Sequence, residues 1–125
     1  KSALVYCVNK DRIKATEFLL VHQPEVDTLD RFEWTPLMWA VKKDYIEIIK
    51  LLVEHKANIN HKDDDGTPLI QYAVENESVD IVKFLIEKGV DINVSDQYGL
   101  SPLVYALKTK NKAMVDLIRS AGGEY

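Results

Sequence analysis

The stretch DRFEWTPLMWAV, residues 30–41, decides how this chain folds, because its features recur at a fixed interval. It opens on Asp30, and an aspartate returns at the same interval at Asp63 and again at Asp96. Equal steps separate the members of two further sets: Ala40, Ala73 and Ala106, and Ile59 and Ile92. A constant period of about 33 residues is the signature of an array of stacked structural repeats.

The period divides the chain into four units, the first and last of them incomplete, within a single domain over residues 1–125. The predicted units cover approximately residues 1–29, 30–62, 63–95 and 96–125. A chain of 125 residues is one domain by length, and 46% apolar residues is the content of a globular protein. One unit cannot bury its apolar face alone, so each unit must stack on its neighbours.

The composition argues against several kinds of partner. A net charge of −4 disfavours nucleic acid as the main partner, and no run approaches the ~20 apolar residues of a membrane span. The single cysteine, Cys7, excludes an internal disulfide and suits a reducing compartment. We therefore expect a cytoplasmic monomer. A secreted effector, or a chain whose N-terminal signal is missing, stays an alternative.

Each unit is predicted to form a helix, a turn and a second helix. Thr35 can cap a helix whose first position is Pro36, where the missing N–H group costs nothing. Later in the same unit, Ile46, Ile49 and Leu52 follow helical spacing. We expect an all-α fold with helices near residues 3–9, 12–22, 36–43, 46–55, 69–75, 79–88, 103–109 and 112–120.

The unit resembles the ankyrin repeat, and the resemblance covers the whole chain. The family pattern D-x-x-G-x-T-P-L-H-x-A-A is matched by DRFEWTPLMWAV, DDDGTPLIQYAV and DQYGLSPLVYAL at residues 30–41, 63–74 and 96–107. The resemblance implies an ankyrin-repeat solenoid of stacked helix-turn-helix units joined by short hairpin-like loops. It also implies a protein–protein interaction scaffold that binds a partner through the concave face of hairpins and first helices. The alternative is a spacer or regulatory arm of a larger protein whose activity lies outside this chain.

The chain departs from the family pattern in three ways. Glu33 and Lys56 stand where the family has glycine, and a side chain at positive φ costs roughly 1 kcal/mol, so these turns are expected to be strained or reshaped. In the third unit Thr67 and Pro68 come one residue early relative to Asp63, so its first helix is expected to start with an offset. The histidine of the T-P-L-H motif is absent, and its positions hold Val5, Met38, Gln71 and Val104.

Two kinds of aromatic residue need separate interpretations. The column Tyr6, Trp39, Tyr72 and Tyr105 follows the period of the units. It is either a ladder that fills gaps between units or a stripe that grips a partner, and both can hold. Trp34 lies in a loop with no periodic reason for burial, which is typical of a binding anchor. Packing on a neighbouring hairpin is its alternative. We expect Trp34 to be partly exposed and to add little to stability.

Charge is distributed by unit, acidic in the third and basic in the second and fourth. Such a surface suits a partner with complementary charges along its length, although an ordinary solvated surface is the alternative. The candidate partner-binding residues are Arg31, Phe32, Trp34, Lys42, Lys43, Asp64, Asp65, Glu75, Tyr98, Leu100 and Lys108. A small ligand held by Trp34 with Lys42 or Lys43 is a lesser alternative.

No motif for catalysis, metal binding or cofactor binding is recognisable. The acidic run Asp63-Asp64-Asp65-Gly66 lacks the alternating ligands and closing glutamate of a calcium loop. The three histidines lack the spacing of metal ligands, and Cys7 suits a packed thiol better than a nucleophile. We therefore predict no catalytic, metal or cofactor residues and no enzymatic activity. The expected partner is a protein of unknown identity, with neither nucleic acid nor a membrane involved.

Overall fold

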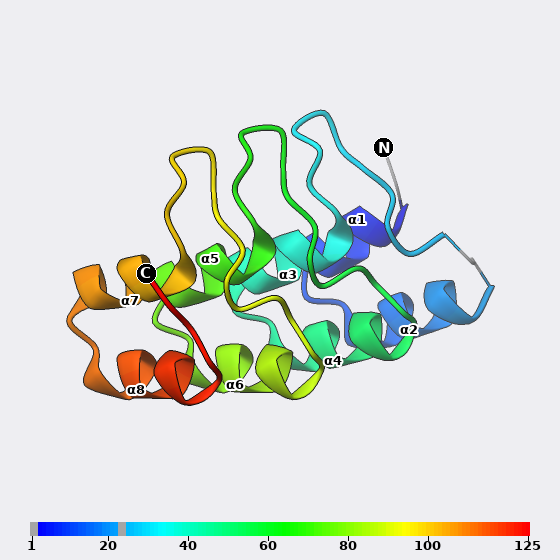
Figure 1. The fold of residues 1–125 in the computed structure, drawn as a ribbon. Coiled ribbons are helices and arrows are strands. Elements are labelled where there is room, and N and C mark those ends of the chain that lie inside the picture. Colours follow the sequence, from blue (N-terminus) through cyan, green and yellow to red (C-terminus); the bar gives the residue numbers. More distant parts are fainter. Residues whose placement is uncertain (1–2, 23–24) are drawn as a thin grey trace.

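The computed structural model describes residues 3–22 and 25–125, and these residues form eight α-helices and no strand (Figure 1). The helices are α1 (Ala3–Asn9), α2 (Ile13–His22), α3 (Pro36–Lys43), α4 (Ile46–Glu54), α5 (Leu69–Glu75), α6 (Val79–Glu87), α7 (Pro102–Thr109) and α8 (Lys112–Ser120). The all-α solenoid expected from the sequence is confirmed. Each helix boundary lies within one residue of its predicted place.

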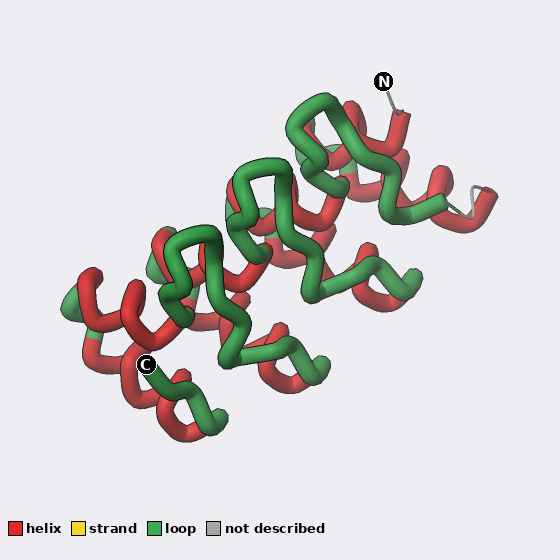
Figure 2. The backbone as a smooth tube through the Cα atoms, turned by 45° about the horizontal axis from the view of Figure 1, so that its top comes forward, coloured by secondary structure: helices red, strands yellow, loops and turns green. Residues whose placement is uncertain are grey.

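The helices form two layers. In Figure 1, α1, α3, α5 and α7 lie side by side in one row, and α2, α4, α6 and α8 form the row beneath. The loops before α3, α5 and α7 project together from one side of the array (Figure 2). We call them the first, second and third fingers, and their described residues are 25–35, 55–68 and 88–101. In the second finger, Lys62 and Pro68 form an isolated antiparallel bridge.

The core lies between the two rows and continues from one unit to the next. Leu52 of α4, which belongs to the apolar pattern with helical spacing, has no exposed surface, and neither does Leu85, its equivalent on α6. The periodic alanines at positions 40, 73 and 106 are also fully buried, because small side chains let the first helices approach closely. No helix among the described residues has both the length and the apolar content to cross a bilayer.

Positive φ angles recur at three positions of the unit, and each position repeats with the period of the array. They are Asp11, Asp44, Glu77 and Lys110 between the paired helices; Glu33, Gly66 and Gly99 at the fingertips; and Lys56, Gly89 and Gly122 after the second helices. Glu33 has a φ of 58° and Lys56 a φ of 71°. Both therefore keep the left-handed backbone of their glycine counterparts. The turns are strained and not reshaped.

Lys56 ends α4 in a Schellman motif. Its backbone N–H donates to the carbonyl of Val53, and the N–H of Ala57 donates to the carbonyl of Leu52, both at 3.0 Å. Gly89 and Gly122 end α6 and α8 with the same pair of bonds. The motif requires a left-handed residue at this position, which glycine adopts without a steric penalty.

The expected offset of the first helix in the third unit is wrong. Helix α5 begins at Leu69, one full period after α3 begins at Pro36, so the helix keeps its register. The early motif changes the cap instead. In the second unit the Thr35 side chain accepts the N–H of Met38 at 3.2 Å, whereas in the third unit Pro68 occupies the N-cap position and makes no side-chain cap bond.

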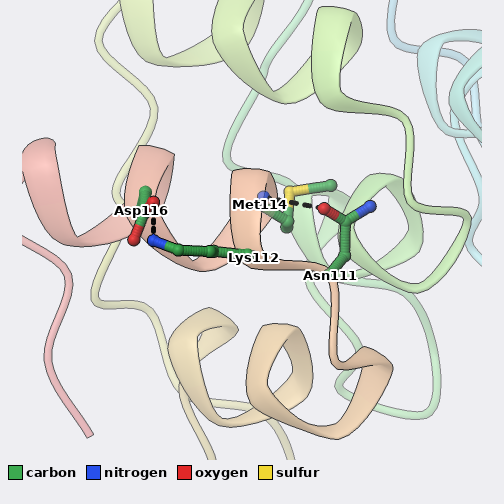
Figure 3. Close-up of polar contacts among 4 residues, drawn as sticks. All are labelled: Asn111, Lys112, Met114 and Asp116. Atoms are coloured by element: carbon green, nitrogen blue, oxygen red, sulfur yellow. Dashed lines mark hydrogen bonds and ion pairs between the residues drawn. The ribbon is translucent and has the colours of Figure 1, made fainter.

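The last helix has a polar outer surface. Figure 3 shows that the Asn111 side chain accepts the backbone N–H of Met114 at 3.1 Å and so caps the start of α8. Lys112, the next residue, forms an exposed ion pair with Asp116 one turn later, with an N···O distance of 3.1 Å. The opposite side of the helix buries Met114 and Ile118 in the core. The surface pair contributes little to stability, so the buried pair holds α8 in place.

Lys56→Gly should raise the free energy of unfolding by about 0.5–1 kcal/mol, because glycine removes the strain of a side chain at positive φ. Urea-induced unfolding measures the change. Lys50→Gly, at an exposed position inside α4, is the matched control and should lower the free energy of unfolding by about 1 kcal/mol. A Lys56→Gly protein no more stable than the parent would show that the turn carries no such strain.

Candidate functional site

An aspartate holds each finger in shape. Asp30 Oδ1 accepts the backbone N–H groups of Phe32 at 2.8 Å and Trp34 at 3.0 Å. The same pair of bonds recurs at 2.9–3.0 Å in the other fingers, to Asp63 from Asp65 and Thr67, and to Asp96 from Tyr98 and Leu100. Such bonds satisfy N–H groups that a tight turn cannot pair within the backbone. The three fingers therefore share one conformation.

The second oxygen of each aspartate binds an aromatic residue nine positions later on the following helix. Trp39 Nε1 donates to Asp30 Oδ2 at 2.9 Å, and the Tyr72 hydroxyl donates to Asp63 Oδ2 at 2.5 Å. The Tyr105 hydroxyl donates to Asp96 in the same way. These three members of the aromatic column are half-buried against the core, and their polar edges tie each finger to its helix. These three residues thus brace finger against helix, whereas Tyr6, the first member of the column, is 57% exposed on α1.

Trp34 crosses from the second unit to the third. Its Nε1 donates to Asp63 Oδ2 at 3.0 Å, the same oxygen that accepts the Tyr72 hydroxyl. The Trp34 ring lies at centroid distances of 4.7 Å from Trp39 and 5.1 Å from Tyr72. It is half-buried, so the expected partial exposure holds. Because it also bonds the neighbouring finger, we revise the expectation that it adds little to stability.

Burial and the neighbouring carboxylates together raise the pKa values of the two tyrosines among these partners. Burial, followed by the hydrogen bond to Asp63, raises the pKa of Tyr72 well above its ordinary value. Burial and the bond to Asp96 raise the pKa of Tyr105 to about 12. Burial alone would raise the pKa of Asp96, but the hydrogen bonds from Tyr105 and from the finger backbone outweigh it and hold that pKa below its ordinary value. The bonds thus favour neutral tyrosine beside ionised aspartate.

The fingertips expose two large aromatic side chains. Phe32 is 51% exposed and Tyr98 is 75% exposed, and the equivalent position of the second finger holds Asp65, also exposed. The Arg31 guanidinium lies 4.9 Å from the centre of the Phe32 ring. Leu100, below the third fingertip, is half-buried. The fingertips therefore present both apolar and charged contacts to solvent.

The remaining predicted residues are exposed charges on the second finger and on α3, α5 and α7. They are Lys42, Lys43, Asp64, Glu75 and Lys108. The Lys42 ammonium lies 5.3 Å from the centre of the Tyr72 ring, and the Lys108 ammonium lies 5.2 Å from that of Tyr105. We call the fingers and the exposed side of α1, α3, α5 and α7 the finger face. Every predicted site residue lies on it.

Sequence reasoning missed the polar links between units. The Asp27 carboxylate accepts the backbone N–H of Asn58, at 3.1 and 3.2 Å. Asn60 accepts the N–H of Asp91 at 2.8 Å, and Asn93 accepts that of Glu124 at 2.8 Å. The acceptors at positions 27, 60 and 93 follow the period of the units, which was the available signal. Likewise, the step from each periodic aspartate to an aromatic nine positions later could have identified the braces.

The opposite side of the molecule carries two open hollows between α4 and α6, of about 400 and 410 Å³. One is lined by Asp44, Glu77 and Asp80, and there the Ser78 hydroxyl donates to Asp44 at 2.7 Å. The other is lined by Lys50, Phe84 and further charged residues. Among the described residues, no three His, Cys, Asp or Glu side chains are grouped to hold a metal ion. The hollows thus offer mixed charge and apolar surface.

Comparison with models of known protein families identifies one matching family. The family model for ankyrin repeats (3 copies) matches residues 1–63 and 58–125, which together span the chain. A search of curated proteins returned no match. Ankyrin repeats are generally protein–protein interaction modules and generally act as non-enzymatic scaffolds.

The pKa of Tyr105 predicts a loss of stability in alkali. The pKa is about 12 in the folded chain and about 10 in an unfolded one, so the stabilisation is complete below pH ~10 and is lost as the pH rises through 12. The free energy of unfolding, measured by urea titration between these values, should fall more steeply for the parent than for Tyr105→Phe. If the free energy of unfolding fell with pH equally in the two proteins, the bond between Tyr105 and Asp96 would not stabilise the folded chain.

Trp34→Phe should lower the free energy of unfolding by about 1–2 kcal/mol, because it keeps a ring but removes the N–H donor to the buried Asp63 carboxylate. Trp34→Ala should cost more, roughly 2–3 kcal/mol, because the ring contacts are lost as well. Phe32→Ala, at an exposed fingertip two positions away, is the control and should stay within about 0.5 kcal/mol of the parent. Urea unfolding curves for Trp34→Ala that match the parent would show that Trp34 adds little to stability, as the sequence predicted.

Proposed function

Because the chain belongs to the ankyrin-repeat family, whose repeats are generally protein–protein interaction modules, we propose that it is a scaffold that binds a protein partner through its concave finger face. One observation carries this proposal. The finger face combines exposed aromatic tips with a half-buried aromatic cluster and exposed charges, all on braced elements. Aromatic anchors surrounded by charged and polar residues are typical of binding surfaces.

The bracing bears directly on binding. A loop that must order itself when a partner arrives loses conformational entropy, which weakens the complex. Here each finger is already fixed by its aspartate, and the first helix is fixed to the finger by the aromatic brace. The tips at Phe32 and Tyr98 therefore meet a partner in a defined arrangement.

The residues divide into two roles. Phe32, Tyr98, Leu100 and the outer edge of Trp34 supply apolar contact. The charged residues select the partner and orient it, since exposed charges contribute more to specificity and association rate than to affinity. They are Arg31, Lys42, Lys43, Asp64, Asp65, Glu75 and Lys108.

The same proposal covers the properties that accompany this role. The chain acts by binding and not by catalysis, as a monomer in the cytoplasm, and contacts neither nucleic acid nor a membrane. The net charge of −4 supports the absence of a nucleic-acid partner. The single cysteine supports a reducing compartment such as the cytoplasm. A regulatory arm of a larger protein would use the same face internally.

The test is a selection of random twelve-residue peptides, displayed on phage, for binding to the full chain. Peptides selected on the parent should bind the double variant Phe32→Ala, Tyr98→Ala about 30-fold more weakly, as expected when hot-spot aromatics are truncated. Fluorescence anisotropy of the labelled peptides gives the Kd values. Both residues are exposed, so thermal unfolding of the variant should match that of the parent.

Phe18→Ala is the matched control. Phe18 is 63% exposed, like the fingertip aromatics, but it lies on α2 in the other helical row. Peptide binding should be unchanged in this variant. If no peptide is enriched, or if Phe18→Ala weakens binding as much as the fingertip variant, the finger face is not the binding surface.

A further inference from the structure

The finger face carries a row of three charges at one position of the unit. Lys42, Glu75 and Lys108 are spaced by one period each, on α3, α5 and α7 respectively, and all three are exposed. Each comes three positions after an aromatic brace, so it lies about one turn further along the same side of its helix. The row therefore reads positive, negative, positive across three neighbouring helices.

The local contacts keep these charges beside the aromatic braces. Lys42 reaches across to the next unit, where its ammonium lies 5.3 Å from the centre of the Tyr72 ring. Lys108 lies 5.2 Å from the centre of its own unit's Tyr105 ring. The negative charge of Glu75 adds to the rise in the pKa of Tyr105, which puts this carboxylate near the same ring. The three charges thus border one continuous aromatic strip.

The spacing of the row limits what can complement it. Packed helices lie about 8–10 Å apart. An extended chain in the polyproline II conformation advances about 3.1 Å per residue with three residues per turn, so every third side chain lies on the same face. One step along the row therefore corresponds to one turn, or about three residues, of such a segment, and three contacts need about seven ordered residues. A helical segment rises only about 1.5 Å per residue, so it needs about fifteen ordered residues to make the same three contacts. Ordering the longer segment costs more conformational entropy.

We propose that the partner segment crosses the finger face in an extended, polyproline II conformation and carries an acidic, a basic and a second acidic residue at intervals of three. These residues lie opposite Lys42, Glu75 and Lys108, with apolar side chains between them against the aromatic strip. The inference rests on the proposed function, and it adds the charge pattern and the conformation of the bound segment.

The experiment repeats the peptide selection on the full chain and on Glu75→Lys. Peptides selected on the parent should show the acid, base, acid pattern with a spacing of three. Selection on Glu75→Lys should replace the central basic residue by an acidic one. Peptides from the parent selection should bind Glu75→Lys about tenfold more weakly by fluorescence anisotropy, because an attraction becomes a repulsion.

Glu87→Lys is the matched control. Glu87 is the exposed last residue of α6, as Glu75 is of α5, but it lies in the other helical row, so the selected pattern should match that of the parent. Peptides that require Phe32 and Tyr98 but keep one charge pattern on parent and Glu75→Lys would overturn this inference and leave the proposed function standing. Selected peptides whose charges are spaced by seven residues would indicate a helical segment and would overturn the extended conformation. A selection that enriches nothing would overturn both proposals.

Discussion

The buried carboxylate of Asp63 is the interaction on which the middle of this molecule depends. One oxygen accepts two backbone N–H groups of its own finger, and the other accepts the Tyr72 hydroxyl and the Trp34 indole N–H. A charge with only 6% exposure is tolerated because these four donors replace water. The shape of the second finger, the position of α5 and the junction with the preceding unit therefore all depend on a single side chain.

The stacking of units combines this brace with two further kinds of contact. Apolar residues bury a continuous core, which supplies most of the stabilisation but has no directional preference. Side-chain acceptors such as Asn60 and Asn93 bind backbone N–H groups of the next unit and so fix its register. Non-directional burial and directional hydrogen bonds together give each unit the same relation to its neighbour. A surface position in one unit thus recurs as a row across the array.

The rows connect the fold to binding. Half-buried aromatics form one row and alternating charges form the next, because both sets lie on the first helices at positions that repeat with the period of the units. Only the exposed part of each row can change without weakening the array, since the aromatics also serve as braces. Specificity is therefore concentrated in the fingertips and in residues such as Lys42, Glu75 and Lys108.

The sequence by itself determined the period and the helices. These features follow from local spacing: apolar residues at helical intervals, and glycine positions that recur even where Glu33 and Lys56 replace the glycine. Only the tertiary structure decided the role of Trp34, because its partner Asp63 is 29 residues away and belongs to another finger. It also decided that α5 keeps its register despite the early Pro68, since packing against α3 and α7 outweighs a one-residue shift in the cap. Contacts between units depend on where stacking places distant side chains, which no local pattern in the sequence records.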